Sequence, residues 1–457
     1  MTNIIWFRND LRIQNNAALK RAIDASSDLE ALYILPENSD LYIGEAAKWY
    51  LQKSLIDLES NLQKLGITIN FYIGDAATIF AERTKNNNAL QIFCNQSFNP
   101  LQIEIDKAVF KTLTAPSALN YVGSDMLVNP NNIKNASGGH YKRFTPFWNK
   151  LQQHISLQTQ DKCLFDIALK TIFKPIKKTT QLSDLNLLSK NKWYDKFENH
   201  WRAGEKNALK RFNEFMENDI VHYDTRRDNL EQDQTSKLSA YINFGELSVT
   251  YLHKTLNQYL HTCDQSCELS VYKFIEQLAW REFAKYSLYY NSDSYLKSIY
   301  SYCDSDVLWN GDDILFELWK KSKTGIDIID SAMNQLWEEG TMHNRARMFS
   351  ASFLTKNLGI HWVKGAQWFW HTLIDADLAA NTMGWQWVAG TAPYSSQFSR
   401  VFNPELQAKK FDKNEKYTHK YLPKYSNIKP IVSIKESSSQ AKHRYRQLQL
   451  LQKENQE

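Results

Sequence analysis

The chain has 457 residues, of which 43% are hydrophobic and 23% are charged, and its formal net charge at pH 7 is +5. This length and composition indicate a folded protein with large cores in two domains, and they exclude a disordered or fibrous chain. The mild positive charge permits an anionic partner without requiring one. Aromatic residues are abundant, with 14 Trp, 23 Tyr and 23 Phe, which suits both core packing and stacking surfaces.

No apolar run reaches the roughly 20 residues of a membrane-spanning helix. Charged residues come too early in the first segment, MTNIIWFRNDLR, for a signal peptide. The five cysteines form neither a CxxC pair nor part of a metal-ligand cluster, so we expect free thiols and no metal site. These features predict a cytoplasmic protein without a membrane anchor.

Residues 1–130 alternate short β-branched or aromatic runs with amphipathic segments. This alternation predicts an α/β domain with a doubly wound parallel sheet. The turn after the first run, RNDLRIQNN, has no glycine and lacks the dinucleotide fingerprint, so we expect no nucleotide phosphate there. The predicted strands are residues 3–7, 30–35, 68–74, 91–95 and 119–122.

The rest of the chain has two parts that differ in composition and periodicity. A polar, irregular stretch, residues 131–192, predicts an interdomain connector with a short helix near residues 145–154. Residues 193–457 have helical periodicity in almost every segment and few Gly or Pro, which predicts a large all-α domain. The basic tail after residue 432 is predicted to be a solvated, partly frayed helix.

The most informative stretch is residues 341–387, where polar and aromatic side chains recur at helical spacing. Asn344 and Arg347 share one helix face, and Asp377 and Asn381 share another. An inward face of acids, amides and arginine needs polar partners. A large planar ligand with polar edges, such as a flavin, would supply them.

Several motifs follow one another along the whole chain: WFRNDLRIQNNAAL, HYKRFTPF, TSKLSAYINFGELS, WREF, KTGIDIIDSAMNQL, MHNRARMFSASFLTKNLGIHW, DADLAAN, GWQW and RVFNP. Together they resemble the photolyase/cryptochrome family, specifically its class I cyclobutane pyrimidine dimer photolyases. The resemblance implies light-driven repair of these dimers in UV-damaged DNA by electron transfer from photoexcited reduced FAD. It also implies a nucleoid-associated monomer that needs no obligate protein partner.

The resemblance assigns FAD contacts to one set of residues. Hydroxyl side chains at a helix start, such as Thr235 and Ser236, match the family's phosphate cradle. Lys237 stands where the family usually has arginine. The positive charge is kept, but the planar guanidinium that can form two parallel hydrogen bonds is absent. Asn381 matches the residue that faces flavin N5, and asparagine there favours repair over signalling by analogy. The expected FAD contacts are Tyr223, Thr235, Ser236, Lys237, Leu238, Ser239, Gln277, Arg281, Arg347, Asp375, Asp377 and Asn381.

Three tryptophans, Trp309, Trp362 and Trp385, match the family's electron-transfer chain. An indole can be oxidised transiently, so such a chain carries an electron from solvent to the excited flavin. Trp319 and Trp368 have no such match, and we expect them to be packing residues.

A pyrimidine dimer inside duplex DNA must be flipped out of the stack to meet a buried flavin, at a cost of about a few kcal/mol. Stacking on aromatic walls, worth about 1–3 kcal/mol per base, offsets this cost. Trp280 and Trp387 match these walls. The expected DNA contacts are Arg227, Gln277, Trp280, Asn344, Arg345, Met348, Trp387, Arg400 and Gln407.

Gln277 departs from the class I pattern, which has glutamate three residues before the WRE tryptophan. Glu276 lies roughly 100° around the helix and cannot substitute. Glutamine is usual here in (6-4) photolyases and animal cryptochromes, but those proteins have histidines where this chain has Asn344 and Met348. A neutral hydrogen bond is worth about 0.5–1.5 kcal/mol against about 1.5–3 for a charge-assisted one. We therefore expect dimer repair with reduced efficiency, with Gln277 and Asn381 as the polar catalytic residues.

The antenna chromophore and the activity both have alternatives. Folate-using relatives carry an asparagine–glutamate pair where this chain has Leu101 and Gln102, so a pterin would lose its best acceptor. A folate, a deazaflavin, another flavin or no antenna are all compatible with the sequence. The alternative functions are a (6-4) photolyase, a cryptochrome photoreceptor without repair, and a light-independent flavin oxidoreductase, which lacks support because no nicotinamide fingerprint is present.

Overall fold

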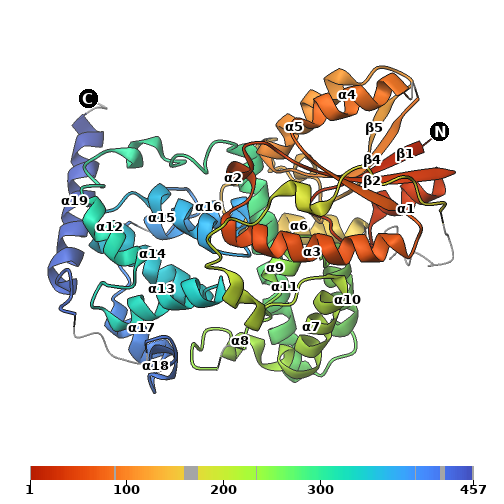
Figure 1. Ribbon diagram of the computed structural model, residues 1–457. Coiled ribbons are helices and arrows are strands. Elements are labelled where there is room, and N and C mark those ends of the chain that lie inside the picture. Colours follow the sequence, from red (N-terminus) through yellow and green to blue (C-terminus); the bar gives the residue numbers. More distant parts are fainter. Residues whose placement is uncertain are drawn as a thin grey trace.

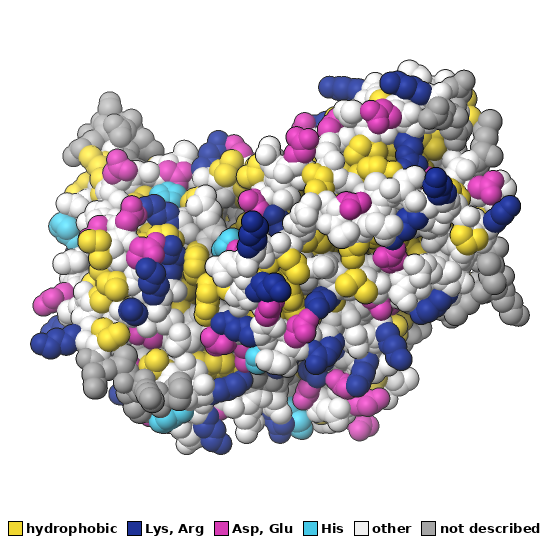
Figure 2. Space-filling model, in the orientation of Figure 1, with side chains coloured by type: hydrophobic (Ala, Val, Ile, Leu, Met, Phe, Trp, Pro, Cys, Tyr) yellow, Lys and Arg dark blue, Asp and Glu magenta, His cyan; other side chains and the backbone are white. Residues whose placement is uncertain are grey.

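The computed structural model describes residues 2–86, 89–158, 173–232, 234–396, 398–422 and 428–454. An N-terminal α/β domain lies beside a larger helical domain, and the last helix lies on the side of the molecule away from the N-terminus (Figure 1). In the described ranges, no helix combines the length and apolarity needed to span a bilayer. On the face seen in Figure 2, basic side chains are interspersed with acidic ones, as the mild net charge suggests.

The N-terminal domain is a five-stranded parallel sheet with the strand order β3-β2-β1-β4-β5. Its strands are β1 (Thr2–Phe7), β2 (Asp28–Leu35), β3 (Thr68–Ile73), β4 (Gln91–Gln96) and β5 (Ala118–Ser124). Its helices are α1 (Ala17–Asp24), α2 (Ser39–Tyr42), α3 (Glu45–Gln63), α4 (Ala76–Asn86) and α5 (Pro100–Thr112). All five predicted strands are therefore present, within a few residues of the predicted bounds.

Helices cover both faces of this sheet. Successive residues of a strand point to opposite faces, and in β1 Ile5 and Phe7 pack in the core that contains α1 and α3. Ile4 and Trp6 pack instead in the core that contains α4 and α5. The prediction of a doubly wound sheet is confirmed (Figure 1). In such sheets ligands bind outside the carboxyl ends of the strands where the strand order reverses, which here is between β1 and β4.

The predicted connector is more ordered than its composition indicates. Its helix α6 (Phe144–Gln158) extends beyond the predicted bounds, with η1 (Pro130–Asn132) before it and η2 (Leu182–Leu185) after it; residues 159–172 lie outside the described ranges. The segment 173–181 runs beside edge strand β3. The side chain of Asn70 accepts the backbone N–H groups of Thr179 at 2.8 Å and Thr180 at 3.1 Å, and Thr180 in turn accepts from the backbone of Phe71.

From residue 193 onward the described chain contains helices and no strand, so the all-α prediction is confirmed. The elements are η3 (Asp195–Asn199), α7 (Glu205–Asn218), η4 (Ile220–His222), α8 (Tyr223–Arg226), α9 (Ser239–Asn243), α10 (Val249–Leu260), α11 (Gln265–Tyr290), η5 (Ser301–Asp304), α12 (Asp313–Lys320), α13 (Asp327–Glu339), α14 (Asn344–Ser352), the π-helical turn η6 (Phe353–Asn357), α15 (Trp362–Thr372), α16 (Leu378–Ala389), α17 (Pro404–Phe411), α18 (Lys416–Tyr421) and α19 (Ile434–Glu454). One apolar core is continuous from the sheet through α11 to Met383 of α16.

The C-terminal tail forms the predicted helix, α19, but it is not solvated all round. Ala441 and Leu448 are buried, and the Arg444 guanidinium donates to the carbonyl of Lys356 in η6 at 2.6 Å. The composition of the tail is polar, yet small and apolar residues recur on one helix face and pack against the body.

Candidate functional site

Helix α16 presents a polar stripe beside an open space. Asp377 begins the helix by accepting the backbone N–H of Ala380 at 2.8 Å, and Asn381 follows one turn later. The amide nitrogen of Asn381 donates to the carbonyl of Ala366 at 2.9 Å, which fixes the plane of its side chain. On the same stripe, a Cβ added at Gly384 would meet no atom within 4 Å. The expected flavin face of α16 therefore borders room for a ligand.

Arg347 and Asp375, both expected to contact FAD, form an ion pair. Nη2 of Arg347 lies 3.0 and 2.8 Å from the two carboxylate oxygens of Asp375, whose side chain is 3% exposed. The Ser239 hydroxyl donates to the same carboxylate at 2.6 Å. Nε of Arg347 donates to the carbonyl of Met342 at 2.8 Å, so the guanidinium is held in one orientation. We call Arg347, Asp375 and Ser239 the Arg347 cluster.

The expected phosphate cradle, residues 235–239, is held by a residue that the sequence did not single out. The Arg211 side chain donates to the carbonyls of Ser236 at 2.9 Å and Thr235 at 3.2 Å. Lys237 is exposed and has a φ of 55°, in the left-handed region, and Leu238 is buried beside it. Arg211 thus holds the backbone of this segment, and hydroxyls and N–H groups such as the segment carries are of the kind that suits phosphate oxygens.

Some polar side-chain atoms of the helical domain have no hydrogen-bond partner among the described residues. Tyr223 is buried with its ring edge-on to Phe274 at 5.2 Å, and the Arg227 guanidinium lies 5.3 Å from the Tyr223 ring. Nη1 of Arg227, Nη1 of Arg281 and Oε1 of Gln234 are buried without a hydrogen-bond partner among the described residues. Such groups are costly when left unpaired, so these residues fit a ligand with many acceptors and donors, as FAD has.

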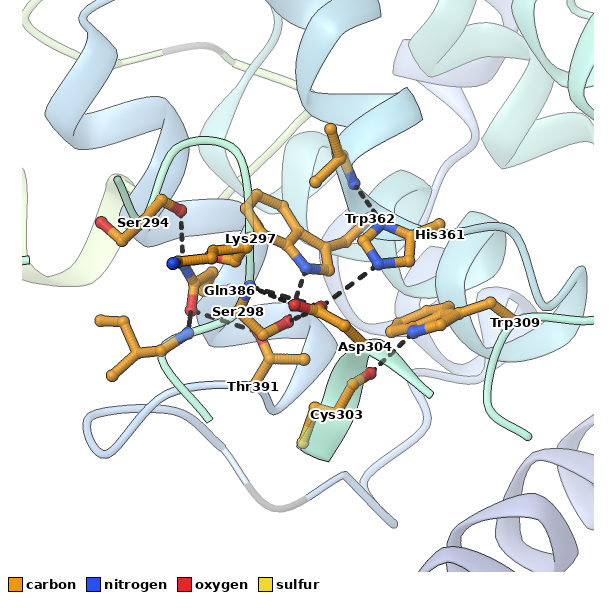
Figure 3. Close-up of polar contacts among 12 residues, drawn as sticks. Ser294, Lys297, Ser298, Cys303, Asp304, Trp309, His361, Trp362, Gln386 and Thr391 are labelled. Atoms are coloured by element: carbon orange, nitrogen blue, oxygen red, sulfur yellow. Dashed lines mark hydrogen bonds and ion pairs between the residues drawn. The ribbon is translucent and has the colours of Figure 1, made fainter. Parts of the chain in front are cut away.

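The three predicted electron-transfer tryptophans lie in one region of the helical domain. Trp385 packs directly on the backbone of α15, because a Cβ on Gly365 would lie 2.2 Å from its ring. Trp362, one turn earlier on α15, is fully buried. The His361 ring lies 4.8 Å from the ring of Trp309 and 6.0 Å from that of Trp362, so it stands between them (Figure 3).

The two tryptophans expected to be packing residues lie in aromatic stacks. Trp319 is fully buried and packs against Phe369 and, edge-on at 6.3 Å, against Trp385. Trp368 stacks with Trp337 at 6.3 Å. Their positions agree with the packing role that we expected.

The start of α14 brings together three of the expected DNA contacts. The exposed Asn344 amide and the Arg345 guanidinium lie 3.7 and 3.9 Å from the sulfur of Met348, so the three side chains share a surface. Arg345 is also paired with Asp228, which lies 3.6 Å from Arg227.

The two expected walls for a flipped base both have aromatic neighbours. Trp280 is stacked on Phe144 with ring centres 3.7 Å apart and an interplanar angle of 8°. Trp387 is stacked on Phe402 at 6.4 Å, and the exposed Arg400 guanidinium lies 5.9 Å from the Trp387 ring. Phe144 covers one face of Trp280, so a base could stack only on the other face of that ring.

Two further expected contacts are half-buried. Gln277 on α11 donates only a long bond, 3.4 Å, to the carbonyl of Lys273, and Gln407 lies on α17. Glu276 is paired with Lys273 at 2.5 Å. Glu276 is therefore engaged elsewhere, in agreement with the prediction that it cannot replace a glutamate at position 277.

A cavity of about 310 Å³ lies at the carboxyl ends of the strands, between the sheet and the helical domain. We call it the sheet-end cavity. Its lining includes residues after β1, β3, β4 and β5 together with Lys285 of α11, Trp370 of α15 and Asp377 at the start of α16. Gln102 lines the cavity and donates to Asp106 at 3.0 Å. Gln102 and Asp377 of this lining were singled out from the sequence, but the cavity as a whole was not, although ligands bind at the switch point of a doubly wound sheet.

The half-buried Asp125 lines this cavity, and the buried Glu282 interacts with Asp125 from outside the lining. Oδ2 of Asp125 accepts from Nζ of Lys285 at 2.5 Å, while Oδ1 is buried without a hydrogen-bond partner among the described residues. Burial acts to raise the pKa of Asp125, but Lys285 and Arg281 bring it below its usual value, so this group is ionised. Burial raises the pKa of Glu282 to about 7, and this carboxyl accepts the N–H of Leu127 at 2.9 Å.

Comparison with known proteins agrees with this arrangement. Residues 3–164 match the family model of DNA photolyase, and residues 274–454 match the model of the FAD binding domain of DNA photolyase. The deoxyribodipyrimidine photo-lyase of Agrobacterium fabrum is 33% identical over 430 residues, which covers 93% of this chain and 88% of the relative. Cryptochrome-1 of Arabidopsis thaliana is 28% identical over 440 residues, 93% of this chain and 63% of that protein.

A solved structure gives the same result. The class III photolyase from Agrobacterium tumefaciens superposes with a TM-score of 0.89 at 30% identity and covers 98% of both chains. Because this relative is described as class III, the expected assignment to class I stays a prediction. The family models and the relatives nevertheless agree over both domains, and the chain belongs to the DNA photolyase/cryptochrome family, with an FAD-binding domain of the photolyase type.

Proposed function

We propose that this protein is a monomeric deoxyribodipyrimidine photo-lyase that repairs cyclobutane pyrimidine dimers in UV-damaged DNA with light. The observation that carries the proposal is the stripe on α16, where Asn381 is fixed by Ala366 beside the open space at Gly384. The relatives named deoxyribodipyrimidine photo-lyase support the same activity.

Different residues of the chain would bind the flavin ring system, the phosphates and the flipped bases. When bound and photoexcited, reduced FAD supplies the electron that splits the cyclobutane ring. The Arg347 cluster holds a fixed charge beside the ring system, and Asn381 offers an amide that can donate or accept one hydrogen bond there. The 235–239 segment binds the phosphates. Trp280 and Trp387 stack on the flipped bases, and no side chain has to act as a nucleophile.

A (6-4) photolyase is the second candidate, and one residue favours it. Gln277 is the residue that the sequence resemblance associates with that lesion. Asn344 and Met348 oppose it, because neither side chain is a titratable proton donor. A cryptochrome without repair activity is the third candidate, and its support is the 28% identity with cryptochrome-1 of Arabidopsis thaliana.

Lesion-specific repair tests these candidates directly. FAD-loaded protein, chemically reduced, is illuminated with oligonucleotides that carry either a thymine cyclobutane dimer or a (6-4) photoproduct. We expect loss of the dimer only, with a higher yield per absorbed photon in Gln277→Glu, because a carboxylate restores the charge-assisted bond. Repair of the (6-4) product alone, or of neither lesion, contradicts the proposal.

We also propose that the sheet-end cavity holds the antenna chromophore. Its support is the unpaired Oδ1 of Asp125, an ionised acceptor suited to the ring N–H groups of a folate, a deazaflavin or a second flavin. We expect Asp125→Asn to lower the content of a second chromophore in purified protein while FAD content stays unchanged. Asp24→Asn, on the surface of α1, is the control. If Asp125→Asn loses FAD but retains the second chromophore, the cavity does not hold the antenna chromophore.

The DNA-binding role of Arg400 has a separate test. Affinity for damaged DNA should fall with salt, and the slope of its logarithm against that of salt concentration should decrease by about one in Arg400→Ala if this guanidinium neutralises one phosphate. Lys107→Ala, on α5 of the α/β domain, should leave the slope unchanged. Equal slopes for wild type and Arg400→Ala contradict the assignment.

A further inference from the structure

A chain of hydrogen bonds leads away from the middle tryptophan. The indole N–H of Trp362 donates to Oγ of Ser298 at 2.9 Å, and the Ser298 hydroxyl donates to Oδ1 of Asp304 at 2.5 Å (Figure 3). Trp362 is fully buried and Ser298 is 2% exposed, so water does not compete for these two bonds. The serine hydroxyl is thus placed to receive one proton and pass on another.

Asp304 gives this chain an end that reaches solvent. Its side chain is 28% exposed, and it also accepts the backbone N–H of Ser298 at 3.0 Å. Partial burial acts to raise the pKa of Asp304, but hydrogen bonds from His361 and Ser298 bring it below its usual value. The group is therefore a carboxylate that can accept a proton and release it to water. Lys297 and Cys303 are the other titratable neighbours of this carboxylate.

His361 orients the carboxylate. Its Nδ1 accepts the backbone N–H of Val363 at 3.2 Å, so the neutral ring carries its proton on Nε2, which lies 3.3 Å from Oδ1 of Asp304. In this tautomer the imidazole donates to Asp304 and is not the proton acceptor. His361 is a positioning residue in this arrangement.

The outer tryptophan has a different partner. The indole N–H of Trp309 donates to the backbone carbonyl of Cys303 at 2.7 Å. A peptide carbonyl is not a useful base near neutral pH, so this bond holds the indole without offering a route for its proton. The two indoles are close in space, but only Trp362 is joined to a carboxylate through a hydroxyl.

The loop that carries Ser298 is fixed to the helix that carries Trp385. The Gln386 amide donates to the carbonyl of Ser294 at 2.8 Å and accepts the N–H of Ile299 at 3.0 Å (Figure 3). Ser298 is therefore held at hydrogen-bonding distance before any reaction, and no loop ordering is needed when the indole is oxidised.

We propose that Ser298 and Asp304 form a proton relay that takes the indole proton of Trp362 after this residue has given up an electron. The inference rests on the electron-transfer role of Trp362 in the proposed function. Trp362 loses one electron to the photoexcited flavin by way of Trp385, and its indole N–H becomes far more acidic than in the unoxidised ring. The proton passes to Oγ of Ser298 as the Ser298 hydroxyl proton passes to Asp304. The products are a neutral tryptophan radical and a neutral carboxylic acid, which then releases its proton to solvent.

The relay has a functional consequence. A deprotonated radical can take its electron back only as the proton returns, so charge recombination with the flavin is slowed. The relay would therefore favour the completion of flavin photoreduction over the loss of the absorbed photon as heat.

Transient absorption after a short light pulse tests the relay in FAD-loaded protein, because protonated and deprotonated tryptophan radicals have different spectra. We expect the wild type to form the deprotonated radical in a step that slows in heavy water. Positioned acid–base groups contribute about 10²–10⁴-fold to proton transfer, so we expect this step to slow by about 100-fold or more in Ser298→Ala and in Asp304→Asn. Ser298→Thr keeps the hydroxyl and should restore the wild-type rate.

Thr391→Val is the matched control, because Thr391 belongs to the same hydrogen-bond network through Gln386 but does not contact Trp362. Its radical kinetics should equal those of the wild type. Near-wild-type FAD content and circular dichroism in each variant show that the fold is intact. An unchanged deprotonation step in both Ser298→Ala and Asp304→Asn overturns the relay.

The relay and the proposed function can fail separately. Enzyme whose FAD is reduced chemically does not use the tryptophans, so all these variants should repair cyclobutane dimers like the wild type. Absence of dimer repair in the wild type refutes the proposed function. Absence of any tryptophan radical in the wild type overturns both the electron-transfer assignment and the relay.

Discussion

Two polar regions adjoin the start of α16, and they differ in how completely the protein satisfies their carboxylates. In the Arg347 cluster, both oxygens of Asp375 are contacted by Arg347, and one also accepts from Ser239. At the sheet-end cavity, Oδ1 of Asp125 is buried without a hydrogen-bond partner among the described residues. Oε1 of the adjacent Glu282, outside the lining, also has no hydrogen bond there and lies 3.6 Å from Nη1 of Arg281.

The difference separates two ways of building a site. A carboxylate with all its partners is a rigid part of the scaffold, and it fixes the electrostatics that a bound ring system will meet. A carboxylate with an unpaired oxygen carries a cost in the folded protein. That cost is reduced when a ligand or a proton arrives, so the sheet-end cavity should respond to ligand and pH more strongly than the Arg347 cluster does.

Breaking the Arg347 cluster should have the largest effect. Arg347→Ala leaves the Asp375 carboxylate buried with only the Ser239 hydroxyl, and loss of one partner of a buried pair costs about 3–5 kcal/mol. We expect a loss of this size in the free energy of unfolding, measured by denaturant titration, together with loss of FAD. Lys20→Ala, which removes an exposed pair with Asp24, should change the unfolding free energy by about 0.5 kcal/mol or less. Equal effects of the two substitutions would falsify the proposed difference between the regions.

Glu282, beside the sheet-end cavity, should give the next largest effect, as a dependence of stability on pH. The pKa of Glu282 rises from its ordinary 4.5 to about 7 on burial, so the folded protein keeps a proton that the unfolded chain has lost. The stabilising contribution is complete below the unfolded pKa and is lost as pH rises through the folded pKa. We expect the wild type to lose about 3 kcal/mol of unfolding free energy relative to Glu282→Gln as pH rises from about 5 to 8.

The measurement is the difference between the two proteins at each pH, because other buried carboxyls, such as Glu246, titrate in the same range. Parallel pH profiles for wild type and Glu282→Gln would show that Glu282 does not carry this dependence.

A substitution of Gly384 should have the smallest effect. It tests whether the space beside this residue is occupied by the ligand. A Cβ at this position meets no protein atom, and alanine in a helix interior is favoured over glycine by about 0.5–1 kcal/mol. Gly384→Ala should therefore stabilise the FAD-free protein by this amount while reducing the amount of FAD retained. Gly365→Ala is the contrast, since its Cβ would collide with Trp385, and it should destabilise both forms. Stronger FAD retention in Gly384→Ala would place the ligand elsewhere.

The parts of the molecule that could be predicted are those with a repeating signal. The five strands and the long helices follow from periodicity, and Arg347 and Asp375 were singled out as FAD contacts by the family resemblance. The helical tail was also predicted, but its buried face was not. Ala441 and Leu448 make that face, and in a polar segment two apolar residues give too weak a periodicity to reveal it.

The parts that could not be predicted depend on contacts between distant segments. Ser298 and Trp362 are separated by 64 positions, and neither the loop of Ser298 nor Asp304 carries a motif. The sheet-end cavity takes its lining from strand ends, from α11 and from the start of α16, so only the strand order brings Asp125 to Lys285. Polar groups in a connector likewise gave no sign that residues 173–181 would follow an edge strand.

That course along β3 protects the protein as well as joining its two halves. An uncovered edge strand offers its free amides and carbonyls to any other extended chain, which is how many folded proteins begin to aggregate. Here Asn70, Thr179 and Thr180 occupy that side with their own hydrogen bonds. Proteolytic cutting or shortening of this link would therefore leave the sheet open to self-association, even if both halves stayed folded.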